Sequence, residues 1–132
     1  MSSTPAACLL IFRESTPEAY SGLTPQQLEA CLDDWNAWFD GLVQSGLLID
    51  GRPLEAQGRI VSGPAGRVLD GPFAEAKETV GGYFLLAVDS LDEATEIARQ
   101  CPNLKHGMTV EVRSVAGGCH LAKSLGRETM RA

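Results

Sequence analysis

Residues 70–78 hold charged side chains that could act on a small molecule. Glu75, Glu78 and Lys77 follow a Gly-Pro turn, and loops that carry such groups are common places for binding and catalysis. Glu75 and Glu78 are candidate catalytic residues for proton transfer, and Lys77 and Asp70 are candidate ligand-binding residues. The structural alternative is that Asp70 accepts backbone N–H groups of the turn while the other charges are solvated.

A second candidate group lies near the ends of two predicted strands. Glu111 and Arg113 are two residues apart in an alternating segment at 108–115, so they lie on the same face of that strand. Arg13 follows the first apolar segment and could join them. Two guanidinium groups in one cleft suit a small carboxylate or phosphate, so all three are candidate ligand-binding residues. The alternative is an ion pair between two subunits.

His106, just before that last strand, is the remaining candidate for proton transfer, and its alternative is an exposed loop histidine. The four cysteines include no Cys-x-x-Cys pair, so we expect small buried thiols and no metal site. The sequence also has no phosphate loop, dinucleotide-binding glycine motif or nucleophile elbow. We therefore expect no cofactor.

Composition limits the class of protein. The chain has 132 residues, 44% of them hydrophobic, which suits a single domain with one core. Its net charge of −6 disfavours direct nucleic-acid binding. No segment has the roughly 20 apolar residues that a membrane span needs, and the first residues lack the pattern of a secretory signal. We therefore expect a cytoplasmic protein without membrane association.

The apolar segment at residues 7–12 predicts a first strand. Thr24, Pro25 and Gln27 then form a capping-box pattern that begins a helix of about 20 residues, ending near Gly46. Gly41 inside this helix predicts close packing against a neighbour. The predicted buried face of the helix is an apolar stripe of Leu28, Leu32, Trp35, Phe39 and Leu42. Trp38 lies off the centre of this stripe, where it packs in the core, meets a partner subunit or lines a pocket.

The rest of the chain predicts an extended segment, a hairpin, a central strand, a second helix and a last strand. These elements lie at residues 47–54, 58–69, 83–88, 90–101 and 108–115. The order predicts an α+β fold, the ferredoxin-like split βαβ sandwich, in a domain of residues 1–116. Residues 117–132 form a C-terminal tail, as a short helix or a disordered end. Both helices would cover one sheet face, so the other face predicts a homodimer.

The segment Asp-Gly-Pro-Phe-Ala-Glu-Ala-Lys-Glu at residues 70–78, followed by Gly-Gly-Tyr at 81–83, resembles the signature of the DGPF branch of the YCII-related family. The opening strand, the entry to the first helix and the last strand also resemble that family. The resemblance covers roughly residues 6–115 and implies a ferredoxin-like dimer whose two sheets close into an α/β barrel. It implies little about activity, although some relatives are linked to sigma-factor genes.

One branch of the wider family carries a histidine–aspartate pair proposed as a catalytic dyad. In this sequence Gln27 stands at the matching position of the histidine, and glutamine cannot titrate near neutral pH. Only Glu55 offers a carboxylate near the matching position of the aspartate. The resemblance therefore does not bring the dyad to this chain.

The sequence predicts a cytoplasmic homodimer with a pocket at the sheet interface that binds, or acts on, a small anionic molecule. The alternative is a non-enzymatic binding or regulatory module that recognises a protein partner, in a transcription-linked setting. A third interpretation is structural, in which the charged residues only join two subunits. The residues themselves name no reaction.

Overall fold

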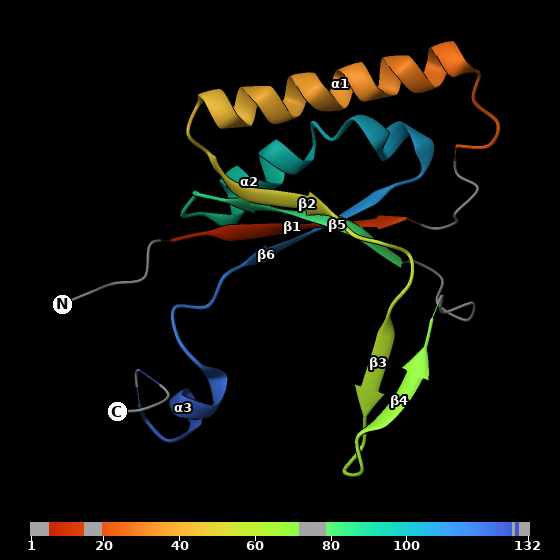
Figure 1. Ribbon diagram of the computed structural model, residues 1–132. Helices are drawn as coiled ribbons and strands as arrows, with labels where there is room; N and C mark the ends of the chain where they lie inside the picture. Colours follow the sequence, from red (N-terminus) through yellow and green to blue (C-terminus); the bar gives the residue numbers. More distant parts are fainter. Residues whose placement is uncertain (1–5, 15–19, 72–78, 128, 130–132) are drawn as a thin grey trace.

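One four-stranded antiparallel sheet forms the centre of the molecule. The computed structural model describes residues 6–14, 20–71, 79–127 and 129. The strands of this sheet are β1 (Cys8–Glu14), β2 (Leu48–Pro53), β5 (Thr79–Leu86) and β6 (Thr109–Ser114). They lie in the order β2-β5-β1-β6 (Figure 1). This order, with a helix after the first and third strands, confirms the predicted α+β class and agrees with a ferredoxin-like fold.

The helices α1 (Pro25–Gln44) and α2 (Leu91–Ala98) and the 3-10 helix η1 (Pro102–His106) lie on one face of the sheet (Figure 1). The predicted capping box of α1 is confirmed. The Thr24 hydroxyl accepts a hydrogen bond from the Gln27 backbone N–H, and the Gln27 side chain accepts one from the Thr24 N–H at 2.8 Å. The side chain of Ser90 likewise caps α2 through the Glu93 N–H.

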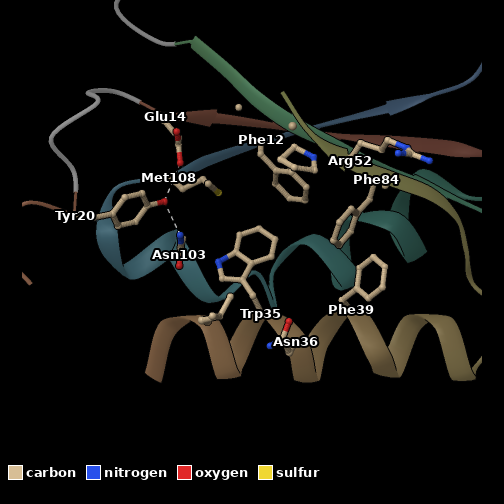
Figure 2. A pocket seen from close by; sticks show the side chains of 15 residues that line it. Phe12, Glu14, Tyr20, Trp35, Asn36, Phe39, Arg52, Phe84, Asn103 and Met108 are labelled. Atoms are coloured by element: carbon tan, nitrogen blue, oxygen red, sulfur yellow. Dashed lines mark hydrogen bonds between the residues drawn. The ribbon is translucent and has the colours of Figure 1, made fainter. Parts of the chain in front are cut away.

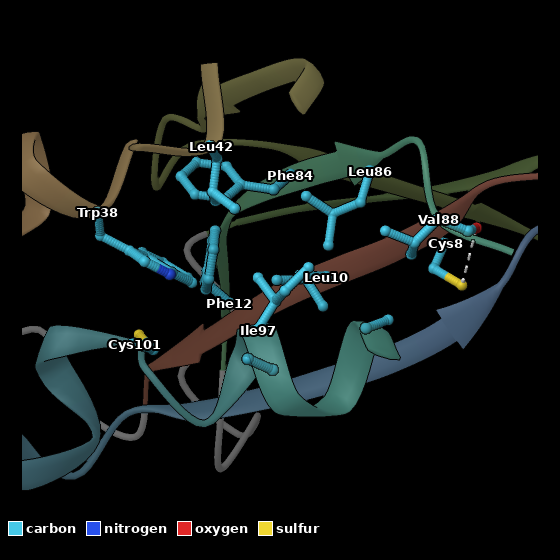
Figure 3. Packing of buried hydrophobic residues seen from close by; sticks show 12 residues of the cluster. Cys8, Leu10, Phe12, Trp38, Leu42, Phe84, Leu86, Val88, Ile97 and Cys101 are labelled. Atoms are coloured by element: carbon cyan, nitrogen blue, oxygen red, sulfur yellow. Dashed lines mark hydrogen bonds between the residues drawn. The ribbon is translucent and has the colours of Figure 1, made fainter. Parts of the chain in front are cut away.

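The core lies between the sheet and these helices (Figure 3). Leu10 and Leu86 are completely buried at its centre. Alternate residues of β1 and β5 point into it, as a strand with one covered face requires. Trp38 and Leu42 bring α1 onto the core, and Ala94, Ile97 and Ala98 bring α2 onto it.

The predicted stripe of α1 is only partly buried. Leu42 is in the core, but Leu32 is 60% exposed and Phe39 is 37% exposed, while Trp38, outside the stripe, is 9% exposed. The first half of α1 contacts η1, as shown by an ion pair between Lys105 and Asp34 at 3.6 Å. The stripe still faces the sheet, since Leu32, Trp35 and Phe39 line a space between the middle of α1 and the strands, and their exposure comes from that space.

Strands β3 (Arg59–Ser62) and β4 (Arg67–Asp70) form the predicted hairpin as a separate two-stranded sheet. This hairpin and α3 (His120–Ser124) lie on the side of the main sheet away from α1 and α2 (Figure 1). Both hairpin strands are exposed, including Ile60, Val61, Val68 and Leu69. None of the helices in the described part of the chain has the length and apolar character that a membrane crossing requires.

Candidate functional site

A cavity of about 450 Å³ lies between the middle of α1 and the sheet. Its wall on the helix side comes from α1, with Trp35 and Phe39, and its opposite wall comes from β1 and β5, with Phe12 and Phe84 (Figure 2). The lining is mainly apolar, and this size suits a small organic molecule. The site therefore arises where α1 stands off the sheet.

The aromatic rings around the cavity hold one another in place. The centroid of the Phe12 ring lies 5.2 Å from that of Trp35 and 4.9 Å from that of Phe84, with interplanar angles of 82° and 90°. Phe39 meets Phe84 in a similar edge-to-face arrangement at 5.8 Å. Such pairs are favourable beyond the area that they bury. The cavity is therefore built on a fixed aromatic frame.

Glycines form part of the cavity floor. Gly51, Gly81 and Gly82 all line it. A Cβ atom on Gly51 would lie 2.6 Å from the Phe84 ring, and one on Gly82 would lie 2.9 Å from the Arg52 carbonyl oxygen. A side chain at Gly51 or Gly82 would collide with the cavity walls, so glycine is required at these two positions, where β2 and β5 pair.

A chain of three polar side chains closes one end of the cavity (Figure 2). The Tyr20 hydroxyl donates a hydrogen bond to Glu14 Oε1 at 2.8 Å, and Asn103 Nδ2 donates one to the Tyr20 oxygen at 2.6 Å. Asn103 is buried, and its Oδ1 has no hydrogen-bond partner among the described residues. The cavity thus has one polar end, and the rest of its lining is mainly apolar.

Burial raises the pKa of Tyr20 from its ordinary value of 10.0 to about 12, and the hydrogen bond to Glu14 and the charge of that carboxylate act in the same direction. The hydrogen bond from Asn103 acts in the opposite direction. The phenol therefore keeps its proton at neutral pH. Tyr20 can donate a hydrogen bond there, and it is unsuited to act as a base.

His106, a predicted catalytic candidate, lies outside the cavity lining, at the end of η1. Its Nε2 is 3.2 Å from Cys31 Sγ, and both side chains are half-buried. This contact joins α1 to η1, the two elements that carry Trp35 and Asn103 of the cavity wall. The histidine therefore has a partner rather than the exposed loop position that was the alternative.

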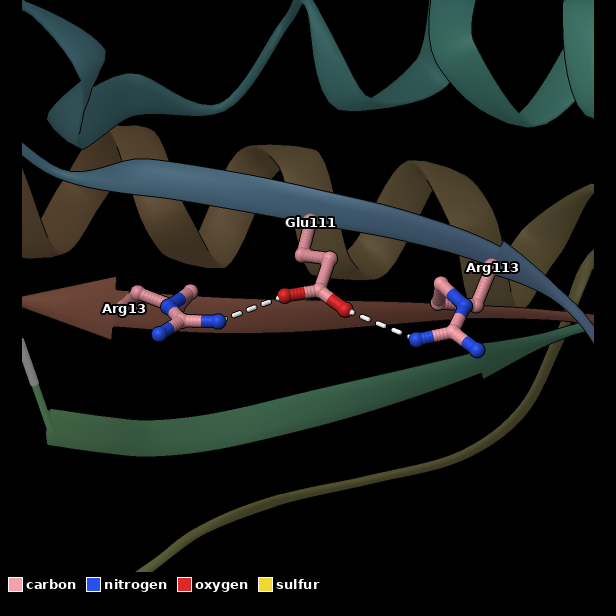
Figure 4. A network of polar contacts seen from close by, with 3 residues as sticks. All are labelled: Arg13, Glu111 and Arg113. Carbon is pink, nitrogen blue, oxygen red and sulfur yellow. Dashed lines mark hydrogen bonds and ion pairs between the residues drawn. The ribbon is translucent and has the colours of Figure 1, made fainter.

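The structure brings three predicted ligand-binding residues together. Glu111 accepts a hydrogen bond from Arg13 at 2.6 Å and one from Arg113 at 3.1 Å (Figure 4). They lie on the sheet face away from the helices, as Figure 4 shows with the helices behind the strands. Both guanidinium groups, that of Arg13 first, lower the pKa of Glu111 below its ordinary value of 4.5.

The other predicted site residues are not brought to this group. Asp70 lies at the end of β4 and pairs with Arg59 across the hairpin at 2.9 Å, with both side chains largely exposed. Glu75, Lys77 and Glu78 lie outside the described residues. The role of the segment at 70–78 therefore stays a prediction.

Sequence reasoning missed the polar end of the cavity. Tyr20 lies in the connection before α1, and Asn103 lies in η1, just beyond the end predicted for the second helix at residue 101. Residues this far apart in sequence carry no shared pattern. Trp38, however, does lie in the core, which was one of its three predicted positions, and it is Trp35 that lines the cavity.

Gln27 and Glu55 do not form a substitute for the catalytic pair of the wider family. The Gln27 side chain is used in the helix cap, and both residues are exposed. Within the described ranges, no three His, Cys, Asp or Glu side chains lie close enough to hold a metal ion.

Comparison with known proteins gives one family and two individual similarities. The model of the YCII-related domain matches residues 7–116. An uncharacterized protein of Rhizobium meliloti (strain 1021) is 46% identical over 50 residues, which are 37% of this chain and 40% of the length of that protein. A solved structure of 5-chloro-2-hydroxyhydroquinone dehydrochlorinase from Burkholderia phenoliruptrix AC1100, in complex with 2,5-dihydroxybenzoquinone, is 18% identical. The similarity covers 83% of this chain and 93% of that one, with a TM-score of 0.43.

Proposed function

The chain belongs to the YCII-related domain family, and we propose that it binds a small ring-bearing organic molecule in the cavity between α1 and the sheet. The observation that carries this proposal is the aromatic frame of Phe12, Trp35 and Phe84 around a cavity of about 450 Å³. Leu32 at the helix wall is 60% exposed, and a bound molecule would cover part of it. The segment at 70–78 supports membership of the DGPF branch.

Tryptophan fluorescence and thermal unfolding test this function, with toluene, indole and naphthalene as probes. A ring in the cavity changes the emission of Trp35 and raises the melting temperature, because binding to the native state alone stabilises it. The Trp35→Phe variant keeps an aromatic wall and loses the contribution of Trp35 to the emission change, so that only Trp38 emits, but it keeps the thermal shift. If no probe shifts the melting temperature of the wild type, the proposal is wrong.

We also propose that the open sheet face joins two copies of the chain, as the sequence predicts. Leu9, Ile11 and Leu85 are half-buried neighbours at the centre of this face, and the Arg13–Glu111 pair lies beside them. An apolar centre with a charged edge is typical of a subunit interface. Sedimentation at micromolar concentration tests it, with Ile11→Arg expected to give monomers. A wild-type monomer would contradict it.

The Arg113 side chain is 68% exposed at the edge of this group and has N–H groups besides the one bonded to Glu111, which supports the predicted small anionic ligand at that interface. The alternative function, a regulatory module with a protein partner, is supported by the exposed apolar side chains of the β3–β4 hairpin, such as Val61, which is 66% exposed. Replacing Val61 by Lys separates the two functions, because it leaves ring binding intact and removes only partner binding.

A further inference from the structure

Glu14 brings a carboxylate to the polar end of the cavity. It lines the cavity and lies on the same face of β1 as Phe12, two residues earlier, which forms part of the wall. Its Oε2 lies 3.1 Å from the position that a Cβ atom on Gly81 would occupy, and Gly81 lines the cavity as well. The carboxylate therefore lies over the cavity floor. Because Glu14 is half-buried and not enclosed, a molecule in the cavity can reach it.

This carboxylate has room for a further donor. Its Oε1 accepts the hydrogen bond from the Tyr20 hydroxyl at 2.8 Å, and no described residue donates to its Oε2. The ion pairs in the described part of the chain all involve other carboxylates. A carboxylate can accept several hydrogen bonds, and it is bound most strongly by a donor that is itself positively charged.

Arg52, the second charged residue in the described lining, does not neutralise this end of the cavity. Its side chain is 75% exposed, its Nε lies 3.7 Å from Asp50 Oδ1, and its guanidinium group points away from the aromatic rings (Figure 2). Burial raises the pKa of Tyr20, and the charge of Glu14 acts in the same direction, as a negative potential at this end of the cavity requires. A carboxylate and the faces of aromatic rings both attract a cation, so the whole cavity favours positive charge.

We infer that the ligand of this cavity is a ring-bearing organic cation whose positively charged amino group pairs with Glu14. Phenethylamine, as its ammonium ion, is a simple member of this class, with a ring for the frame of Trp35 and Phe84 and an N–H donor for the carboxylate. The inference rests on the proposed binding function and adds the charge and the polar group of the ligand to it. A ligand with a carboxylate of its own would be repelled by Glu14.

Three probes of nearly the same shape test the inference on the full chain by isothermal titration calorimetry at neutral pH and low salt. Phenethylamine is a cation, 2-phenylethanol is neutral, and phenylacetate is an anion. The amine binds about tenfold more tightly than the alcohol, a difference of about 1.4 kcal/mol. Phenylacetate binds more weakly than the alcohol. Added salt reduces the preference for the amine, because it screens the charges.

Two variants that remove the same charge locate the contact. Glu14→Gln keeps an oxygen that can accept from the Tyr20 hydroxyl, and the preference for the amine over the alcohol disappears. Asp50→Asn is the matched control, because Asp50 also accepts from a tyrosine hydroxyl, that of Tyr83 at 2.7 Å, but is not part of the cavity lining. The preference survives in Asp50→Asn, which separates pairing at Glu14 from attraction to the net charge of −6. Circular dichroism checks folding, and if Glu14→Gln does not fold, the order of the three probes in the wild type and in Asp50→Asn decides.

The outcomes separate the inference from the function on which it rests. Equal affinity for the amine and the alcohol, or tighter binding of phenylacetate, overturns the inference and leaves ring binding in place. The inference is also overturned if a folded Glu14→Gln keeps the preference, or if Asp50→Asn loses it. Failure of the wild type to bind any of the three probes, or toluene, indole and naphthalene, overturns the proposed function itself.

Discussion

Asn103 Nδ2 donates a hydrogen bond of 2.6 Å to the hydroxyl of Tyr20, which lies 83 residues earlier in the chain. The contact ties η1 to the connection before α1 and closes one end of the cavity. The same hydroxyl donates to Glu14 at the end of β1, so one phenol oxygen connects three separate segments. The hydrogen bonds that close this end of the cavity therefore meet at a single hydroxyl group.

Replacing Tyr20 by Phe should lower the free energy of unfolding by about 1–2 kcal/mol, because the buried amide of Asn103 loses its acceptor. Urea denaturation measures this change. Tyr83→Phe is the matched control, since Tyr83 bonds to Asp50 at 2.7 Å in a less enclosed position than Tyr20, and its effect should be smaller. If both variants lost the same free energy of unfolding, the hydrogen bonds that join Glu14, Tyr20 and Asn103 would have no special role.

The titration of Tyr20 should be displaced to high pH. The pKa of Tyr20 is raised to about 12 by burial and then by Glu14, so the folded state favours the protonated phenol. The resulting stabilisation is complete below the ordinary pKa of 10.0 and is lost as pH rises toward 12. Phenolate absorbance of the Tyr83→Phe variant, in which Tyr20 is the remaining tyrosine, measures this titration directly.

Removing the charge of Glu14 separates its effect on the pKa of Tyr20 from the effect of burial. Glu14→Gln should lower the pKa of Tyr20 but leave it above 10.0, because burial is the larger cause. Circular dichroism must show the native signal over the same pH range. A titration of Tyr20 near its ordinary value in the folded wild type would show that the hydroxyl is not enclosed as described.

The free energy of unfolding should depend on pH through the carboxyl group of Glu111. The hydrogen bonds from Arg13 and Arg113 lower the pKa of its carboxyl group, so its contribution is present above the ordinary value of 4.5 and is lost as pH falls through the lowered value. Urea denaturation of the wild type and Glu111→Gln should therefore differ at neutral pH and converge below about 4.5. High salt should reduce the difference, since the pairs are partly exposed.

Local sequence patterns were sufficient to predict the two main helices, the strands and one of the two polar side-chain groups, that of Arg13, Glu111 and Arg113. The capping box at Thr24 and Gln27 marks the start of α1 because it depends on residues three apart. Glu111 and Arg113 could be placed on one face because the period of a strand is two residues. Pairing with Arg13 then followed from the neighbouring strand, β1, in the observed register.

The cavity could not be predicted in the same way. The periodicity of the stripe predicted that Leu32 and Phe39 face the sheet, and they do, but the pattern carries no information on the distance between the helix and the sheet, which creates the cavity. Trp38, outside the stripe, also packs against Phe12 and Phe84, and this tertiary aromatic contact has no periodic signal in the sequence. The predicted close packing at Gly41 is also wrong, because a Cβ atom there would have nothing within 4 Å.

Two Gly→Ala substitutions should therefore have opposite effects on the free energy of unfolding. Gly41→Ala should raise it by about 0.5–1 kcal/mol, since Gly41 is exposed inside α1 and alanine favours the helix. Gly82→Ala should lower it by about 1–3 kcal/mol, because the new Cβ lies 2.9 Å from the backbone carbonyl of Arg52 and β2 must shift. Denaturant unfolding measures both changes, with ring binding as a second readout.

The shift of β2 reshapes the cavity floor, so Gly82→Ala should also weaken the binding of toluene, whereas Gly41→Ala should not. If Gly82→Ala were neutral in both measurements, the close approach of β2 and β5 at the cavity floor would be wrong.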